Sequence, residues 1–175
     1  MPTRIFGDKN TLQFQIAAKD PGSEQMRCVD IHAADTHLTA NDNAVYVPAF
    51  LFLLHRDLKS FRNGARFQPR PDVFGDLAPE RIHSIFADDS EQAPDTGNLS
   101  DLWGFLNLGD TTLHLLSFLI PTRDRLYLTV DMHRPDEAAL EIRAVEVSAE
   151  ALQQTLLDTF EVVAAEYPGE KSHLS

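Results

Sequence analysis

The sequence predicts an α+β domain: an antiparallel sheet of about six strands in two meanders, packed on one face by two helices. Three observations support this fold class. Segments that alternate apolar and polar residues occur in two groups, one in each half of the chain. Turn-forming residues separate the members of each group, as in strands joined by hairpins. Segments with helical apolar spacing, near 48–62 and 149–166, follow the two groups.

The first predicted strand, TLQFQIAA, alternates Leu12, Phe14 and Ile16 with polar residues, which is typical of a strand buried on one face. Two further short strands follow it, the first of them as the returning strand of a hairpin. The pair Pro21–Gly22 predicts the first turn, because both residues favour turn conformations. We therefore expect a meander built from residues 11–18, 25–34 and 36–47.

The apolar spacing then changes to a helical period. Pro48 suits the first turn of this helix, and Gly64 suits a left-handed stop after it. Arg56, Lys59 and Arg62 lie outside the apolar stripe and are expected to face water. The buried stripe would be Phe50, Leu51, Leu54, Leu58 and Phe61.

The second group of strands precedes the last helix. In its middle strand, Leu126, Leu128 and Val130 alternate with polar residues, which predicts one buried face. The sheet face away from the helices should be largely open to solvent or used for contact. Ser148 is the expected N-cap of the last helix. The segments are strands 111–120, 124–133 and 138–147, with a short helix near 78–87 before them.

Length and composition indicate one globular domain. The 175 residues are 43% hydrophobic, which is enough for a core without a metal or disulfides. The only cysteine is Cys28, and the longest apolar run is about half of the roughly 20 residues that span a bilayer. We expect a soluble, cytoplasmic protein without a cofactor or membrane partner, with an internal acidic loop at 88–101 and a flexible tail at 168–175.

The formal charge of −12 is unevenly distributed. Residues 1–70 carry a net charge of +2, whereas 71–101 and 102–175 each carry −7. Such a chain would be repelled by a phosphate backbone, which argues against a nucleic-acid partner. An acidic exterior suits a basic protein partner and speeds the encounter with it. It also keeps a protein soluble, so charge alone leaves both interpretations open.

The acidic loop and the tryptophan that follows it form the best candidate contact site. The loop contains no basic residue, and the acids could pair with cations of a partner. Tryptophan is a typical interface anchor, although a single tryptophan is more often part of a core. The predicted contact residues are Asp88, Asp89, Glu91, Asp95, Asp101 and Trp103.

Histidines offer an alternative in metal binding or hydrolysis. Asp30 and His32 would share one face of a strand, where carboxylate and imidazole could hold a metal. His114 and His133 lie on strands predicted to be neighbours and could act as a general base. No nucleophile accompanies them in a known motif, and a polar hairpin rim explains the first pair equally well. We therefore predict no catalytic residue and no metal ligand.

Parts of the chain resemble a family of bacterial immunity proteins that are found beside polymorphic secreted toxins. The resemblance lies in the opening RIFGDKNTLQFQI, the helix PAFLFLLHRDLKSFRNG, and the closing segments SFLIPTRDRLYLTVDMHRPD and LEIRAVEVSAEALQQTLLDTFEVV. It covers about two-thirds of the chain, whereas residues 66–101 are longer and more acidic than the family pattern.

This resemblance implies a non-enzymatic inhibitor that binds and neutralises a cognate toxin domain by protein–protein contact. The acidic excess agrees with a basic toxin as the partner. Two alternatives stay open: a metal-binding protein or hydrolase that uses the histidines, and an acidic adaptor or secretion chaperone. The oligomeric state is left open as well.

Overall fold

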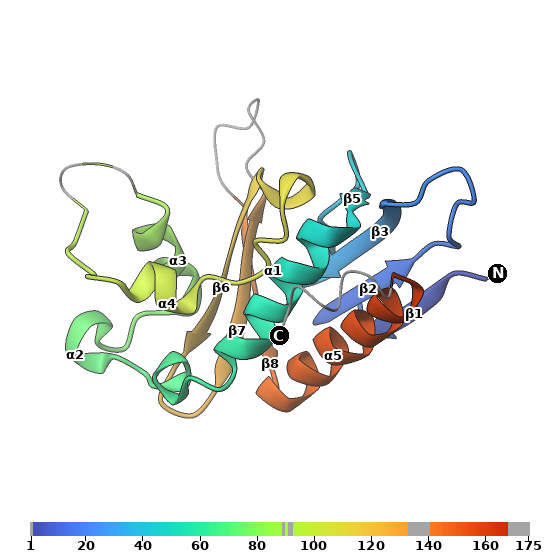
Figure 1. Cartoon of the computed structure of the whole chain (residues 1–175). Coiled ribbons are helices and arrows are strands. Elements are labelled where there is room, and N and C mark those ends of the chain that lie inside the picture. Colours follow the sequence, from blue (N-terminus) through green and yellow to red (C-terminus); the bar gives the residue numbers. More distant parts are fainter. Residues whose placement is uncertain (1, 89, 91–92, 133–140, 168–175) are drawn as a thin grey trace.

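The computed structural model describes residues 2–88, 90, 93–132 and 141–167. It confirms the predicted α+β class, with α-helices packed against antiparallel strands (Figure 1). The two predicted meanders form two sheets, of five and three strands. The predicted tail, 168–175, lies outside the described residues.

The N-terminal sheet has the strand order β1-β2-β3-β4, with β5 paired to β3. The first strand was not predicted, and it pairs with the second so that Phe6 lies opposite Phe14. Gly7 ends the first strand with φ +81°, where a Cβ atom would come within 2.1 Å of the Leu12 carbonyl oxygen. A side chain is therefore excluded at this turn. The strands are β1 (Arg4–Gly7), β2 (Leu12–Ile16), β3 (Met26–Ala33), β4 (Thr36–His37) and β5 (Ala44–Tyr46).

Two helices pack against this sheet and each other, as predicted: α1 (Val47–Ser60) and α5 (Ala149–Glu166). Pro48 lies in the first turn of α1, and the Ser148 hydroxyl accepts a hydrogen bond from the backbone nitrogen of Ala151. The predicted stop at Gly64 is wrong, because α1 is capped at Phe61 and Gly64 instead begins the 3₁₀-helix η1 (Gly64–Phe67). A side-chain cap thus marks the start of α5, and α1 ends where the backbone nitrogen of Phe61 donates to the carbonyl oxygens of Leu58 and Lys59.

The second sheet contains β6 (Leu115–Pro121), β7 (Leu126–Met132) and β8 (Ile142–Val147) in sequence order. One face places Leu119, Leu128 and Val130 in the main core, which confirms the predicted alternation of β7. The opposite face was predicted to be largely open to solvent or used for contact, whereas on β6 and β7 it is covered by other parts of the same chain. Thr129 there is fully buried, because short helices cover it.

These covering helices are α2 (Pro71–Phe74), α3 (Pro79–Phe86) and α4 (Leu99–Trp103), on the side of β6–β8 away from α1 (Figure 1). Only α3 matches a prediction, the helix near 78–87. Together with β6 they enclose a second apolar cluster, separate from the main core. Its buried members are Phe74, Ile82, Leu99, Trp103, Phe118 and Ile120.

His83 of α3 is buried beside this cluster and is expected to destabilise the protein in acid. Its Nδ1 lies 2.8 Å from Thr129 Oγ1, and burial lowers its pKa from 6.5 to about 4. As the pH falls, the unfolded chain binds this proton first, so the free energy of unfolding decreases between about pH 6.5 and 4. The loss from pH 7 to 4.5 should be about 2 kcal/mol, measured by urea denaturation.

His83→Asn is the control, because asparagine does not titrate in this range and its amide can still face Thr129. Burial raises the pKa of Asp57, which lowers stability as the pH increases, but that effect is common to both proteins. Subtracting the two pH profiles isolates His83. Identical profiles for the variant and the parent protein would contradict the prediction.

Candidate functional site

The acidic loop lies at the surface where the structure describes it. Asp88, Asp95 and Asp101 are exposed, whereas Asp89 and Glu91 lie outside the described residues. Asp88 Oδ1 accepts a hydrogen bond from the Ser90 backbone nitrogen at 2.9 Å, and Asp95 Oδ1 accepts one from Gly97 at 2.9 Å. The Ser90 hydroxyl and backbone hold the pKa of Asp88 below its usual range. Two of the acids therefore cap turns as well as carrying charge.

Trp103 does not belong to this surface, which corrects its predicted role as a contact residue. Its side chain is fully buried in the second apolar cluster. The indole lies 5.6 Å from the ring of Phe74 and 5.9 Å from that of Phe86, between centroids. In this conformation it anchors the end of the acidic loop and offers no area to a partner.

Buried and half-buried charges hold the chain that follows the loop. Arg66 is 4% exposed, and its guanidinium donates to the carbonyl oxygens of Leu102 at 3.1 Å and Gly104 at 2.8 Å. The backbone nitrogen of Leu106 donates to Asp57 Oδ2 at 3.2 Å. Burial raises the pKa of Asp57, while Arg56 beside it acts to lower it. The basic segment near 55–70 thus supports the acidic loop from within.

Arg66, Asp57 and Leu106 line a cleft of about 620 Å³. Its other lining residues come from the end of α1, from α3 and α4, from the segment 104–107, from η2 (Asp110–Thr112) and Leu113 after it, and from β6. Leu113 and Leu116 line it and remain 71% and 42% exposed. Asp101 also lines the cleft, so one of the predicted contact acids shares this cleft with the two exposed leucines. We call this the α1–β6 cleft.

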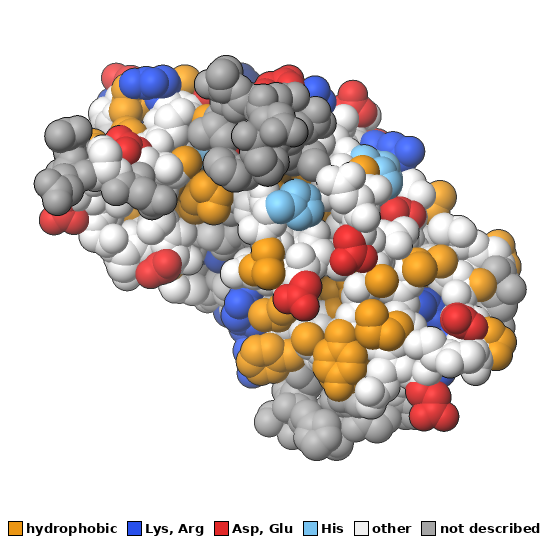
Figure 2. All heavy atoms as spheres, turned by 90° about the horizontal axis from the view of Figure 1, so that it is seen from above, with side chains coloured by type: hydrophobic (Ala, Val, Ile, Leu, Met, Phe, Trp, Pro, Cys, Tyr) orange, Lys and Arg blue, Asp and Glu red, His pale blue; other side chains and the backbone are white. Residues whose placement is uncertain are grey.

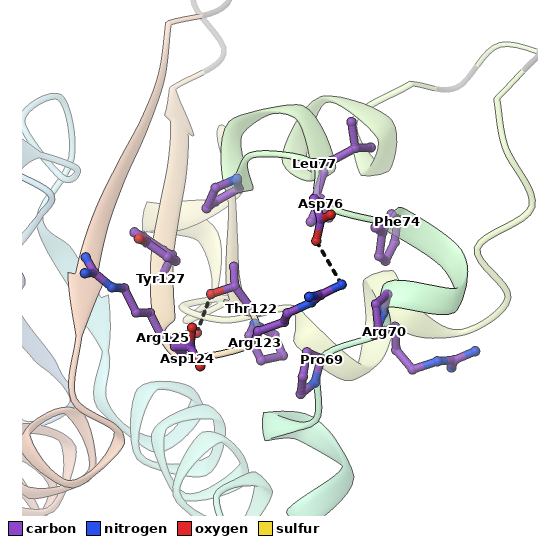
Figure 3. A pocket seen from close by; sticks show the side chains of 15 residues that line it. Pro69, Arg70, Phe74, Asp76, Leu77, Thr122, Arg123, Asp124, Arg125 and Tyr127 are labelled. Carbon is purple, nitrogen blue, oxygen red and sulfur yellow. Dashed lines mark hydrogen bonds and ion pairs between the residues drawn. The ribbon is translucent and has the colours of Figure 1, made fainter.

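A second, smaller hollow of about 290 Å³ lies between the β6–β7 turn and the segment around α2 (Figure 3). Phe74 lies at its wall, and Arg123 reaches across it to Asp76, with 3.3 Å between nitrogen and oxygen. Its other arginines are also paired, Arg70 with Asp72 at 2.6 Å and Arg125 with Glu146 at 2.8 Å. Because each positive charge already has a carboxylate, the hollow has no open anion site.

The histidine alternatives find little support. His37 Nε2 lies 3.0 Å from Asp30 Oδ1, and its ring stacks on that of His32 with centroids 4.3 Å apart. Within the described part of the chain, no three His, Cys, Asp or Glu side chains are placed to hold a metal. His114 Nε2 lies 2.9 Å from the carbonyl oxygen of Leu38. Its predicted partner, His133, falls outside the described residues.

The cleft was not foreseen from the sequence. Leu116 belongs to a near-continuous apolar segment, 111–120, which predicts a central strand of the sheet; this is wrong, because β6 is an edge strand beside β7. The available signal was the alternation of side chains along the strand. Leu116 lies on the same face as Phe118 and Ile120, and it is the one of the three nearest the start of the strand. Arg66 gave no signal, because its carbonyl partners lie 36 and 38 residues away.

None of the described helices has the length and apolarity needed to cross a lipid bilayer. No protein-family model and no curated protein sequence matches the chain. Among solved structures, the fold is similar to the crystal structure of CdiI from Burkholderia dolosa AUO158, with a TM-score of 0.55. The sequences are 13% identical, and the similarity covers 90% of this chain and 99% of the other. The two proteins therefore share a fold over nearly their full lengths.

Proposed function

We propose that this protein is an immunity protein, which binds a cognate bacterial toxin inside the producing cell and neutralises it by protein–protein contact. The observation that carries the proposal is the fold similarity to CdiI, a contact-dependent inhibition immunity protein, over 90% of the chain. An inhibitor of this kind acts by occupying a surface of the toxin, and it needs no catalytic group of its own.

The charge distribution supports a basic toxin surface as the partner. The chain carries a net charge of −12, and Asp88, Asp95 and Asp101 are exposed on one loop and the short helix that follows it. Like charges gathered on one surface create a field that attracts an oppositely charged partner and raises the association rate. The acidic loop would thus guide the toxin toward the neighbouring surface.

The test uses a toxin domain identified by screening the products of genes adjacent to this one, and the triple variant Asp88→Asn, Asp95→Asn, Asp101→Asn. Asparagine removes the charge but keeps a side-chain oxygen that can accept the two turn hydrogen bonds. Association should slow by roughly tenfold at low salt, and the difference should shrink at high salt. The melting temperature should stay within about 2 °C, because exposed substitutions of this kind change stability little.

The matched control is Asp20→Asn, Glu24→Gln, Asp42→Asn, which removes the same charge from the N-terminal sheet region. Asp20 and Asp42 are exposed and also accept a backbone hydrogen bond two residues ahead, from Gly22 and Ala44. This control should slow association by less than about threefold. If the parent protein neither binds the toxin domain nor protects cells that express it, the proposed function is wrong.

A further inference from the structure

We propose that the α1–β6 cleft is the binding site for the toxin, and that it binds an apolar side chain of the toxin that is flanked by a lysine or arginine. This inference rests on the proposed function and assigns it a binding site. The toxin surface that binds there would present a basic and an apolar side chain next to each other.

The apolar part of the argument comes from exposed leucines. Leu113 and Leu116 line the cleft and are 71% and 42% exposed, although their chain neighbours Thr112 and Leu115 are buried. Phe52 on α1 is also 59% exposed. It lies one helical turn before Arg56, and Arg56 lines the cleft. In the view from above, several hydrophobic side chains lie close together on one face of the molecule, with acidic side chains among them (Figure 2). Contiguous exposed apolar surface marks contact sites.

The charge of the cleft selects the second part of the ligand. Both arginines that line the cleft already have partners within the protein. Arg66 donates hydrogen bonds to two backbone carbonyl oxygens. Arg56 forms an ion pair with Asp57 at 3.3 Å and donates to the carbonyl oxygen of Asn107 at 2.9 Å. In contrast, Asp101 forms no ion pair with any residue that the structure describes, and it is exposed. The four charged side chains that line the cleft sum to zero, but Asp101 is the exposed one that has no ion pair or side-chain hydrogen bond with a described residue, so a cation of the ligand complements it.

The cleft is also built before the partner arrives. The backbone nitrogen of Phe105 donates to the carbonyl oxygen of Ser117 at 2.8 Å, which ties the segment after α4 to β6. Arg66 and Asp57 hold the same segment from the other side. Because the walls are held by hydrogen bonds, little conformational entropy is lost when a ligand enters, which favours tight binding.

Leu116→Glu is the decisive variant, and Leu77→Glu is its matched control. Both leucines are 42% exposed, but Leu77 lines the smaller hollow instead of the cleft. With the full-length protein and the toxin domain in a calorimeter, we expect at least about a 100-fold loss of affinity for Leu116→Glu. The loss for Leu77→Glu should be less than about threefold. Circular dichroism melting of both variants reports whether each remains folded.

Two further variants keep the result interpretable. Leu113→Glu, on the 71% exposed neighbour, should also weaken binding by more than about tenfold, and it tests the cleft without altering β6. Asp101→Lys should weaken binding more at low salt than at high salt. If the parent protein binds the toxin and all three cleft variants bind it as tightly as the parent does, the cleft is not the binding site, and the proposed function stands. Loss of binding in Leu77→Glu alone would mean that the toxin binds at the smaller hollow, and it would overturn the inference.

Discussion

Replacing Trp103 with alanine is expected to lower the free energy of unfolding by about 3–5 kcal/mol. The side chain is fully buried and packs edge-on or tilted against Phe74 and Phe86. It also belongs to the smaller of the two cores, whose six buried members leave few neighbours able to fill the cavity. Guanidinium denaturation followed by far-UV circular dichroism measures the loss, since Trp103 is the only tryptophan and its fluorescence disappears with it.

Trp103→Phe separates packing from the indole nitrogen. Nε1 is buried without a hydrogen-bond partner in the described part of the chain, so phenylalanine removes an unsatisfied donor while it keeps an aromatic ring. We expect this variant to be destabilised by less than half as much as Trp103→Ala. A loss below about 1 kcal/mol for alanine, combined with weaker toxin binding, would instead mean that Trp103 lies at the surface.

The local signals in the sequence were sufficient for most helices and hairpins. The α5 helix was predicted at its observed bounds, because a serine cap and a long apolar stripe agree there. The β6–β7 hairpin follows from alternation and a short turn. β1 was missed because four residues with mostly exposed side chains carry no alternation to detect. The covering helices α2 and α4 were missed because four or five residues are too few for a helical period.

The candidate site was less predictable, since it depends on contacts between distant segments. The exposed acids could be named from composition alone, and three of them are at the surface as expected. Whether Trp103 faces water or Phe74 depends on where α2 packs, which no nearby residue encodes. Arg56, Lys59 and Arg62 were expected to face water and are exposed, yet Arg66 in the same basic segment is buried. A polar side chain enters a core only when tertiary structure supplies its partners.

Arg66 supports the second-largest expected effect: Arg66→Met should lower the free energy of unfolding by about 3 kcal/mol. Methionine has a similar length and keeps the apolar contacts, but it cannot donate to the carbonyl oxygens of Leu102 and Gly104. Two carbonyls then lose their donors, one on each side of Trp103. The buried Asp57 carboxylate also loses a nearby positive charge, which raises its pKa further. Urea denaturation followed by Trp103 fluorescence measures both the stability and the local environment.

Arg62→Met is the matched control, because Arg62 is exposed and four residues earlier in the same basic segment. It should change stability by less than about 0.5 kcal/mol. Arg66→Lys distinguishes geometry from charge, since lysine keeps the positive charge but has one nitrogen where arginine places two against separate carbonyls. An intermediate loss for lysine means that the forked hydrogen bonds position the loop end. Parent-like stability for Arg66→Lys would mean that a positive charge opposite Asp57 is sufficient for stability. The hydrogen bonds to Leu102 and Gly104 would then not be needed to hold the acidic surface.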